Sequence, residues 1–309
     1  MVDVVVVGSL MIDLVSVVDR IPKLGETIHG RSFQQNFGGK GANQCVAAGR
    51  LGASVALIGN VGDDQYGTQY LAELKNNSIN TEFVQQVSGC NTGIASIWVD
   101  GKGQNSIIIT ANANERLTIE DVTRAESLIK TAKIVICQLE VPQEVTLAAL
   151  KMAKKHNVRS IFNPAPAVKD LSTTFLQYTD IFCPNETEAE LLCGFPVDSD
   201  ESCQRALTFF LEQGARVPVI TLGERGAAFA TKEHPDMQTV KTDAVVPVDS
   251  TGAGDAFVGA LACLLATKPD TDFAEAVSRA CKYASLTVQS AGTQPSYPTR
   301  QQLHMSFFH

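Results

Sequence analysis

The stretch DSTGAGDAF, from Asp249 to Phe257, places small residues between two aspartates and then enters an apolar run. We interpret it as a loop that leads into a helix starting near Gly252 to Asp255. The first backbone N–H groups of a helix have no partner within the helix, and glycine lets a ligand approach the backbone closely. The stretch therefore predicts an anion-binding turn for a transferring phosphoryl group.

Asp255 closes this turn and could accept a proton from a hydroxyl group that attacks the phosphoryl group. The alternative is an ordinary aspartate in the first turn of a helix, where the helix dipole stabilises its charge. Because Gly-x-Gly before a helix is common, the turn taken alone favours this alternative.

A second glycine-rich stretch, NFGGKGANQ, lies far upstream at 36–44. It is not a phosphate loop of the G-x4-G-K-[ST] type, because glycine follows both Gly39-Lys40 and Gly101-Lys102. The dinucleotide pattern G-x-G-x-x-G is also absent after the first strand. A nucleotide would therefore be bound without either motif.

Short apolar runs rich in β-branched residues alternate with helix-length segments, which predicts a parallel sheet covered on both faces. The sequence thus favours an α/β protein. The expected strands lie at 2–8, 53–59, 134–139, 159–164, 180–185 and 217–223.

Two regions depart from this order of strands and helices. In residues 14–35 polar and apolar positions alternate, and the segments 92–100 and 105–110 flank GKGQ as in a β-hairpin. We expect these segments, about 14–35 and 92–110, to form a small sheet that acts as a lid. With no linker or repeat visible, we expect 1–309 to be a single domain.

Composition limits the classes of partner. The 309 residues carry a formal net charge of −8, which argues against nucleic-acid binding. No apolar run reaches the roughly 20 residues of a membrane span, and the N-terminus lacks signal-peptide features. We expect a cytoplasmic protein, with a nuclear location left open. The eight cysteines form no C-x-x-C pair, which makes a zinc or redox site improbable.

The ordered set of motifs resembles the ribokinase family of carbohydrate kinases over nearly the whole chain. The residues that carry the resemblance are GSLMIDL (8–14), NFGGKGANQCVAAGRLGA (36–53), GNVGDDQYG (59–67), NPAPA (163–167), PNETEAELL (184–192), ITLGERGA (220–227), DSTGAGDAFVGAL (249–261) and AGTQPSYP (291–298).

The resemblance implies a ribokinase-like three-layer α/β fold with a mainly parallel central sheet and a small β-sheet lid. It also implies transfer of the ATP γ-phosphoryl group to the 5-hydroxyl of D-ribose, giving D-ribose 5-phosphate. Asp255 would be the base, and the N–H groups of Gly252, Ala253 and Gly254 the anion hole. The implied sugar-binding residues are Asp13, Gly39, Lys40, Asn43, Glu140 and Asp255.

The resemblance further implies ATP as co-substrate, Mg²⁺ held through water by Glu188, K⁺ as a monovalent activator, and a homodimer formed through the lid. The implied ATP-binding residues are Asn185, Thr221, Gly223, Gly254 and Cys281. The positions that match the potassium site are Asp249, Thr251, Thr287, Ser290, Gly292 and Ser296. The chain departs from relatives at Met11, near the sugar, and at Cys281, near adenine.

Each of these polar residues also has a purely structural interpretation. Asp13 could cap a helix, Asn43 could sit in a turn, Glu140 could be solvated, and Asn185 could start a helix. Different functions stay open as well: a kinase for 2-deoxyribose, fructose, adenosine or a keto sugar acid, or a catalytically silent sugar or nucleotide sensor.

Overall fold

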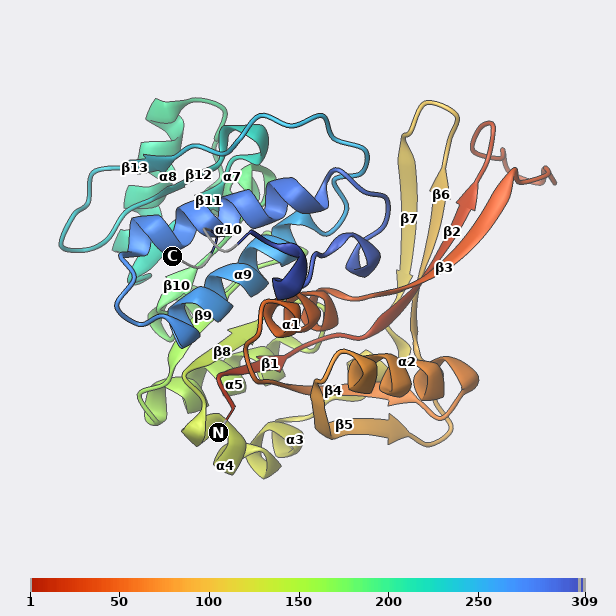
Figure 1. The fold of residues 1–309 in the computed structure, drawn as a ribbon, viewed down its shortest axis with the longest axis horizontal. Helices are drawn as coiled ribbons and strands as arrows, with labels where there is room; N and C mark the ends of the chain where they lie inside the picture. The colour runs from red at the N-terminus through yellow and green to blue at the C-terminus, as the bar shows by residue number, and fades with distance from the viewer. Residues whose placement is uncertain (1, 305–306, 308–309) are drawn as a thin grey trace.

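The computed structural model describes residues 2–304 and 307, which form one large and one small β-sheet (Figure 1). The large sheet has nine strands in the order β13-β12-β11-β10-β9-β8-β1-β4-β5. From β11 to β5 all neighbouring strands are parallel, whereas β12 and β13 add an antiparallel edge. Its strands are β1 (Val4–Val7), β4 (Val55–Gly62), β5 (Asn80–Val87), β8 (Ile134–Cys137), β9 (Arg159–Phe162), β10 (Ile181–Phe182), β11 (Val217–Thr221), β12 (Ala227–Phe229) and β13 (Gln238–Val240).

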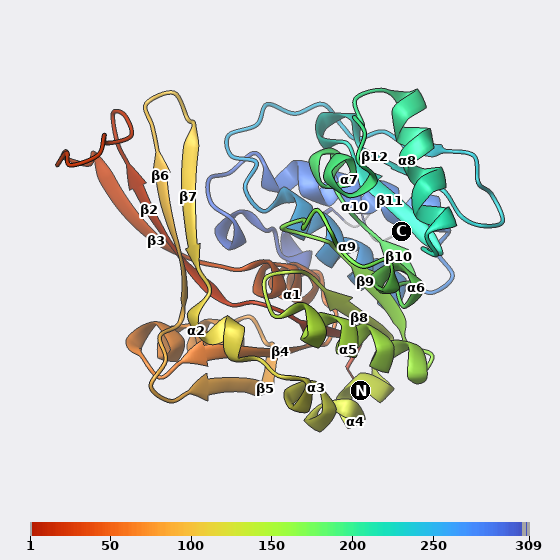
Figure 2. The same cartoon turned by 180° about the vertical axis from the view of Figure 1, so that it is seen from behind.

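Helices cover both faces of this sheet (Figures 1 and 2). They are α1 (Lys40–Arg50), α2 (Gln65–Asn76), α3 (Ile119–Arg124), α4 (Glu126–Thr131), α5 (Gln143–Lys155), α6 (Thr174–Gln177), α7 (Glu186–Cys193), α8 (Asp200–Glu212), α9 (Ala253–Thr267) and α10 (Phe273–Thr287).

The valine run of β1 shows why helices cover both faces of the sheet. Val4 and Val6 pack in one core cluster with α1, α2, α9 and α10, whereas Val5 and Val7 pack in the other with α3, α4, α5, α7 and α8. Successive side chains of a strand point to opposite faces, so a continuous apolar run requires two cores. The predicted three-layer α/β fold is confirmed.

All six predicted strands lie in the parallel part of the large sheet, with ends that differ by a few residues. Three strands at the two ends of the sheet were not predicted. In the edge strand β5 (NTEFVQQV) only Val84 is buried, so its apolar pattern is weak. The strands β12 and β13 have three residues each, and so short a run gives little signal even in β12, whose residues are all buried.

The small sheet has the order β3-β2-β6-β7 and stands beside the main body (Figures 1 and 2). Its strands are β2 (Met11–Val17), β3 (Ser32–Gly38), β6 (Gly93–Val99) and β7 (Asn105–Thr110). The last two lie within the expected segment 92–110, whereas β2 begins before the expected segment 14–35 and β3 ends after it. The sheet is mixed, because β2 pairs parallel with β6 and antiparallel with β3. It reaches inward to Met11 and Gly38, close to the carboxyl end of β1. That one domain spans 1–309 stays a prediction.

Several of the motifs follow the carboxyl ends of neighbouring parallel strands. Gly8 and Ser9 follow β1, Gln138 to Glu140 follow β8, and Asn163 follows β9. This edge of an open parallel sheet is where ligands bind in α/β proteins. Among the described residues, no helix is both long and apolar enough to cross a membrane.

Candidate active site

The predicted loop-to-helix turn is present at the start of α9. Gly252 precedes the helix with φ of 78° and ψ of 2°, a left-handed conformation that favours glycine. A Cβ atom there would lie 2.3 Å from the Thr293 side chain and 2.7 Å from the Tyr297 hydroxyl. Asp255 follows in the first turn and is only 7% exposed. Backbone geometry and packing therefore both require glycine at 252.

The Asp255 carboxylate accepts two hydrogen bonds from α1. Asn43 Nδ2 donates to its Oδ2 at 3.0 Å, and Gln44 Nε2 donates to its Oδ1 at 2.9 Å. Asn43 therefore lies in a helix and beside the predicted base, not in a turn. The two glycine-rich stretches meet at a single carboxylate.

Glycines allow α1 to pack closely on the connection between β1 and β2. Gly39 has a φ of 88°, and a Cβ atom at Gly41 would lie 2.5 Å from the Ser9 backbone nitrogen. A Cβ atom at Gly38 would lie 2.3 Å from the Asp13 carboxylate. The pattern FGGKG is thus explained by close backbone contact around Asp13 and Ser9.

Asp13, Lys40 and Glu140 gather beside Asp255. Glu140 Oε2 accepts hydrogen bonds from the Ser9 hydroxyl at 2.6 Å and from the Lys40 backbone N–H at 2.9 Å. Glu140 is thus held in place by the protein instead of being merely solvated, and Asp13 lies in β2 and caps no helix. The predicted sugar-binding residues are brought together. Met11, where the chain departs from relatives near the sugar, is buried in β2.

Burial and mutual repulsion raise the pKa values of Asp13 and Glu140. Burial, with the nearby charges of Glu140 and Asp255, raises the pKa of Asp13 to about 7. Burial also raises the pKa of Glu140. Burial alone would lower the pKa of Lys40, but the surrounding carboxylates, Asp255 foremost, raise it, so Lys40 stays cationic. Several carboxylates with one ammonium group make a site suited to binding hydroxyl groups.

A cleft of about 150 Å³ opens at Asp255 and continues toward a larger cavity of about 740 Å³. Asn185, Thr221 and Gly254 line both. The cleft is lined by Lys40, Asn163, Ala165, Cys183, Asn185, Glu188, Thr221, Gly252, Gly254, Asp255 and Val258. The structure also places all five predicted ATP-binding residues, Asn185, Thr221, Gly223, Gly254 and Cys281, in the wall of the larger cavity. The geometry suits a ligand that extends from the larger cavity to the carboxylate.

Asn185 and Glu188 form a capping box at the start of α7. Glu188 N–H donates to Asn185 Oδ1 at 2.8 Å, and Asn185 N–H donates to Glu188 Oε2 at 2.9 Å. The structural interpretation of Asn185 is therefore correct, although both residues also line the cleft. Burial raises the pKa of Glu188. The cap fixes a carboxylate in the cleft wall.

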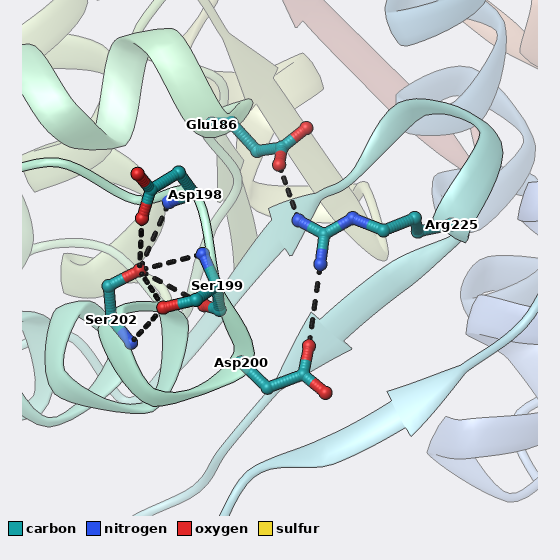
Figure 3. Close-up of polar contacts among 6 residues, drawn as sticks. All are labelled: Glu186, Asp198, Ser199, Asp200, Ser202 and Arg225. Atoms are coloured by element: carbon teal, nitrogen blue, oxygen red, sulfur yellow. Dashed lines mark hydrogen bonds and ion pairs between the residues drawn. The ribbon is translucent and has the colours of Figure 1, made fainter.

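Arg225 joins three elements at the rim of the larger cavity (Figure 3). Its guanidinium pairs with Glu186 at the start of α7 and with Asp200, 3.4 Å away, at the start of α8. Ser199 and Ser202 form the capping box of α8 beside it. The turn that contains Gly223 is thereby tied to two helix N-termini.

Asp249 connects the loop before α9 with the loop after α10. Its Oδ1 accepts from the Thr251 N–H at 2.9 Å, and its Oδ2 accepts from the Gly292 N–H at 2.9 Å. Although burial opposes the effect, these hydrogen bonds lower the pKa of Asp249. The Thr287 and Ser296 hydroxyls donate to the carbonyls of Ala284 and Thr293. All six predicted potassium-site residues, Ser290 included, thus lie on these two loops and the adjoining end of α10.

Other polar residues of the site were not predicted as functional. They are Ser9, Gln44, Gln138, Asn163, Gln294 and Tyr297. All but Gln138 lie inside motifs that carried the family resemblance, which is the signal that could have identified them. The eight cysteines are free, and the described residues contain no group of three His, Cys, Asp or Glu suited to a metal.

The chain is similar to known proteins over nearly its whole length. The model of the pfkB family of carbohydrate kinases matches residues 1–300. The chain is 48% identical over 305 residues to ribokinase from Mus musculus, covering 99% of this chain and 94% of that protein. It is 37% identical over 304 residues to deoxyribokinase from Salmonella typhi, covering 98% and 97%. The solved structure of Arabidopsis thaliana ribokinase complexed with ribose and ATP superposes with a TM-score of 0.87, at 31% identity and 97% coverage of both chains.

Proposed function

Because the chain belongs to the pfkB family of carbohydrate kinases, we propose that it transfers the γ-phosphoryl group of ATP to the 5-hydroxyl of D-ribose. The product is D-ribose 5-phosphate. The observation that carries the proposal is the Asp255 carboxylate, which lies in a helix N-terminal turn where a small polar cleft opens toward a larger cavity. The similarity to ribokinases, one of them solved with ribose and ATP, supports the choice of substrates.

In this reaction Asp255 accepts the proton of the attacking hydroxyl, which makes the oxygen a better nucleophile. The N–H groups of Gly252, Ala253 and Gly254 stabilise the negative charge of the transferring group. In the structure the Ala253 N–H donates to the Ser250 carbonyl at 3.2 Å, so a phosphoryl oxygen has to compete with that long hydrogen bond. Gly252 and Gly254 line the cleft directly.

The sugar hydroxyls are bound by Asp13, Asn43 and Glu140, with Gly39 and Lys40 completing the site. A pentose offers a ring of hydroxyls and little apolar surface, so carboxylates and amides are the suitable partners. The Lys40 cation also balances the charge of the acids around it. Asp13 lies in the small sheet itself, which serves as a lid that excludes water.

The residues present fit the two metal ions that the family implies. Glu188 offers one fixed carboxylate in the cleft wall, which suits Mg²⁺ that keeps most of its water and contacts ATP phosphates. Asp249 and the loops that carry Thr251, Ser290 and Gly292 offer oxygen ligands for K⁺. When bound, the two ions supply positive charge near the phosphates.

A homodimer formed through the lid is part of the proposal. The small sheet exposes Phe33, Ile107, Ile108 and Ile109 to solvent, an unusual density of large apolar side chains for a free surface. Contact between the lids of two copies would cover them. Light scattering of the purified protein tests the oligomeric state.

The similarity to deoxyribokinase supports a second candidate, phosphorylation of 2-deoxyribose. One missing hydroxyl changes binding by only about 1–3 kcal/mol when its protein partner is left unpaired, so the two sugars need direct comparison. The test is ATP consumption with Mg²⁺ on ribose, 2-deoxyribose, fructose and adenosine, in matched potassium and sodium buffers.

Potassium-stimulated turnover that is fastest on ribose supports the proposal. Faster turnover on another acceptor would support the kinase activity but would show that ribose is not the preferred substrate. Ribose binding without ATP consumption identifies a sensor instead.

A further inference from the structure

We propose that Gln44 is a positioning residue for the phosphoryl transfer, because a chain of buried amides holds its NH₂ group against one oxygen of the Asp255 carboxylate. The inference rests on the proposed function, in which Asp255 is the base. Gln44 has no exposed surface, so it meets neither sugar nor nucleotide and acts only through Asp255.

Every hydrogen-bonding atom of the Gln44 side chain is engaged. Its Nε2 donates to Asp255 Oδ1 at 2.9 Å and to Asn163 Oδ1 at 3.0 Å. Its Oε1 accepts from Gln138 Nε2 at 2.6 Å. The amide therefore has two acceptors on one side and a donor on the other.

This arrangement permits only one orientation of the amide. A flipped Gln44 would turn Oε1 toward two other oxygens and its NH₂ group toward that of Gln138. Asn163 cannot flip in compensation, because its Nδ2 donates to the Cys183 carbonyl at 2.8 Å. Gln138 does not fix this orientation by itself, since its Oε1 has no hydrogen-bond partner among the described residues. The Asn163 oxygen and the acceptor-only carboxylate of Asp255 together require Gln44 to present a donor to the base.

The second carboxylate oxygen is held by a more accessible partner. Asn43 Nδ2 donates to Asp255 Oδ2 at 3.0 Å, and Asn43 Oδ1 accepts from Gln294 Nε2 at 3.0 Å. Gln44 has no exposed surface, whereas Asn43 keeps 6% of its surface exposed. Oδ1 is therefore held by a fully buried residue, and Oδ2 by a residue that the proposed function assigns to the sugar site.

Fixing Oδ1 sets the plane of the carboxylate and hence the direction in which the base meets the hydroxyl proton. Reaction rates depend steeply on such alignment, whereas substrate binding depends on other contacts. Loss of the Gln44 donor should therefore slow the chemical step and leave both substrates bound normally.

The test uses Gln44→Met, which keeps the length of the side chain and removes the donor. Single-turnover phosphorylation of ribose should fall about 10- to 100-fold, the range expected for a lost hydrogen bond to a charged group. The dissociation constants for ribose and for a non-hydrolysable ATP analogue should stay within about twofold. Gln138→Met, which removes the support of Gln44 without touching Asp255, should give a smaller loss of the same kind.

Ser160→Ala is the matched control, because it removes a buried hydroxyl in β9 whose partners are Tyr178 and Asp180. It should lose stability without loss of the single-turnover rate. The inference is overturned if Gln44→Met keeps a normal rate, if ribose binding weakens as much as the rate, or if Ser160→Ala is equally slow. Should Gln44→Met not fold, a normal rate in Gln138→Met overturns it.

Asp255→Asn separates this inference from the proposed function. If that variant keeps turnover, the assignment of the base fails. If it is inactive while Gln44→Met is unimpaired, only the role of Gln44 fails.

Discussion

The Tyr297 hydroxyl donates a hydrogen bond of 2.8 Å to the carbonyl oxygen of Gly252, which ties the loop after α10 to the start of α9. Burial raises the pKa of Tyr297 well above its usual range, so the phenol stays a neutral donor. Arg50 in turn donates to the Tyr297 carbonyl at 3.0 Å. The proposed anion hole is thus supported from a distant part of the chain.

Tyr297→Phe should therefore loosen the turn at Gly252 without affecting the sugar site. We expect a loss of about 1 kcal/mol in the free energy of unfolding, typical of one buried hydrogen bond. The kcat should fall severalfold, and the KM for ribose should not change. Urea unfolding and steady-state kinetics measure these effects. An unchanged kcat would show that the turn does not need this support.

Arg225→Gln should weaken ATP binding because it releases the turn at Gly223 from Glu186 and Asp200. Partly exposed ion pairs contribute up to about 1 kcal/mol, so the KM for ATP should rise by no more than about fivefold. The kcat and the KM for ribose should stay the same. Arg216→Gln is the control, because it removes a surface ion pair with Asp180 away from both cavities. An equal change in both variants would contradict the role of Arg225.

Asp13 should make stability depend on pH. Its pKa of about 7 in the folded protein lies above its ordinary value of 3.8, so the folded state holds the extra proton between these values. Its stabilising contribution is complete below about pH 4 and is lost as the pH rises through 7. Asp13→Asn removes this dependence.

Urea unfolding at pH 5 and pH 8 measures the effect of Asp13. The free energy of unfolding of the unmodified protein, relative to Asp13→Asn, should fall by about 2–4 kcal/mol between these pH values. Parallel behaviour of the two proteins would show that Asp13 is ionised with its ordinary pKa. The KM for ribose of the variant should rise in either case.

The sequence predicted those parts of the fold that have a local cause. Continuous apolar runs such as that of β1 mark strands buried on both faces, and Gly252 marks a turn with positive φ. The edge strand β5 has no comparable signal, because most of its side chains are partly exposed. Local patterns therefore located the core better than the edges of the sheet.

Recognised motifs in the sequence predicted residues of the site, but not the contacts between them. The turn at Asp255 suggested a base, but only the family resemblance favoured that role over an ordinary helix aspartate. The partners of Asp255, Asn43 and Gln44, lie more than 200 positions away in sequence. Nothing local shows that Gln44, one position after Asn43, points to the same carboxylate. Its orientation depends on Gln138 and Asn163, which the packing of α1 on the sheet brings together.

The most direct test of the account is ribose-dependent ATP consumption by the unmodified protein and by Asp255→Asn under identical conditions with Mg²⁺ and K⁺. We predict ready turnover by the unmodified protein and a loss of about 10²–10⁴-fold in kcat for the variant, since a general base is removed while the charge-neutral amide keeps the shape of the site. A variant that consumes ATP with ribose as fast as the unmodified protein would contradict the role of Asp255.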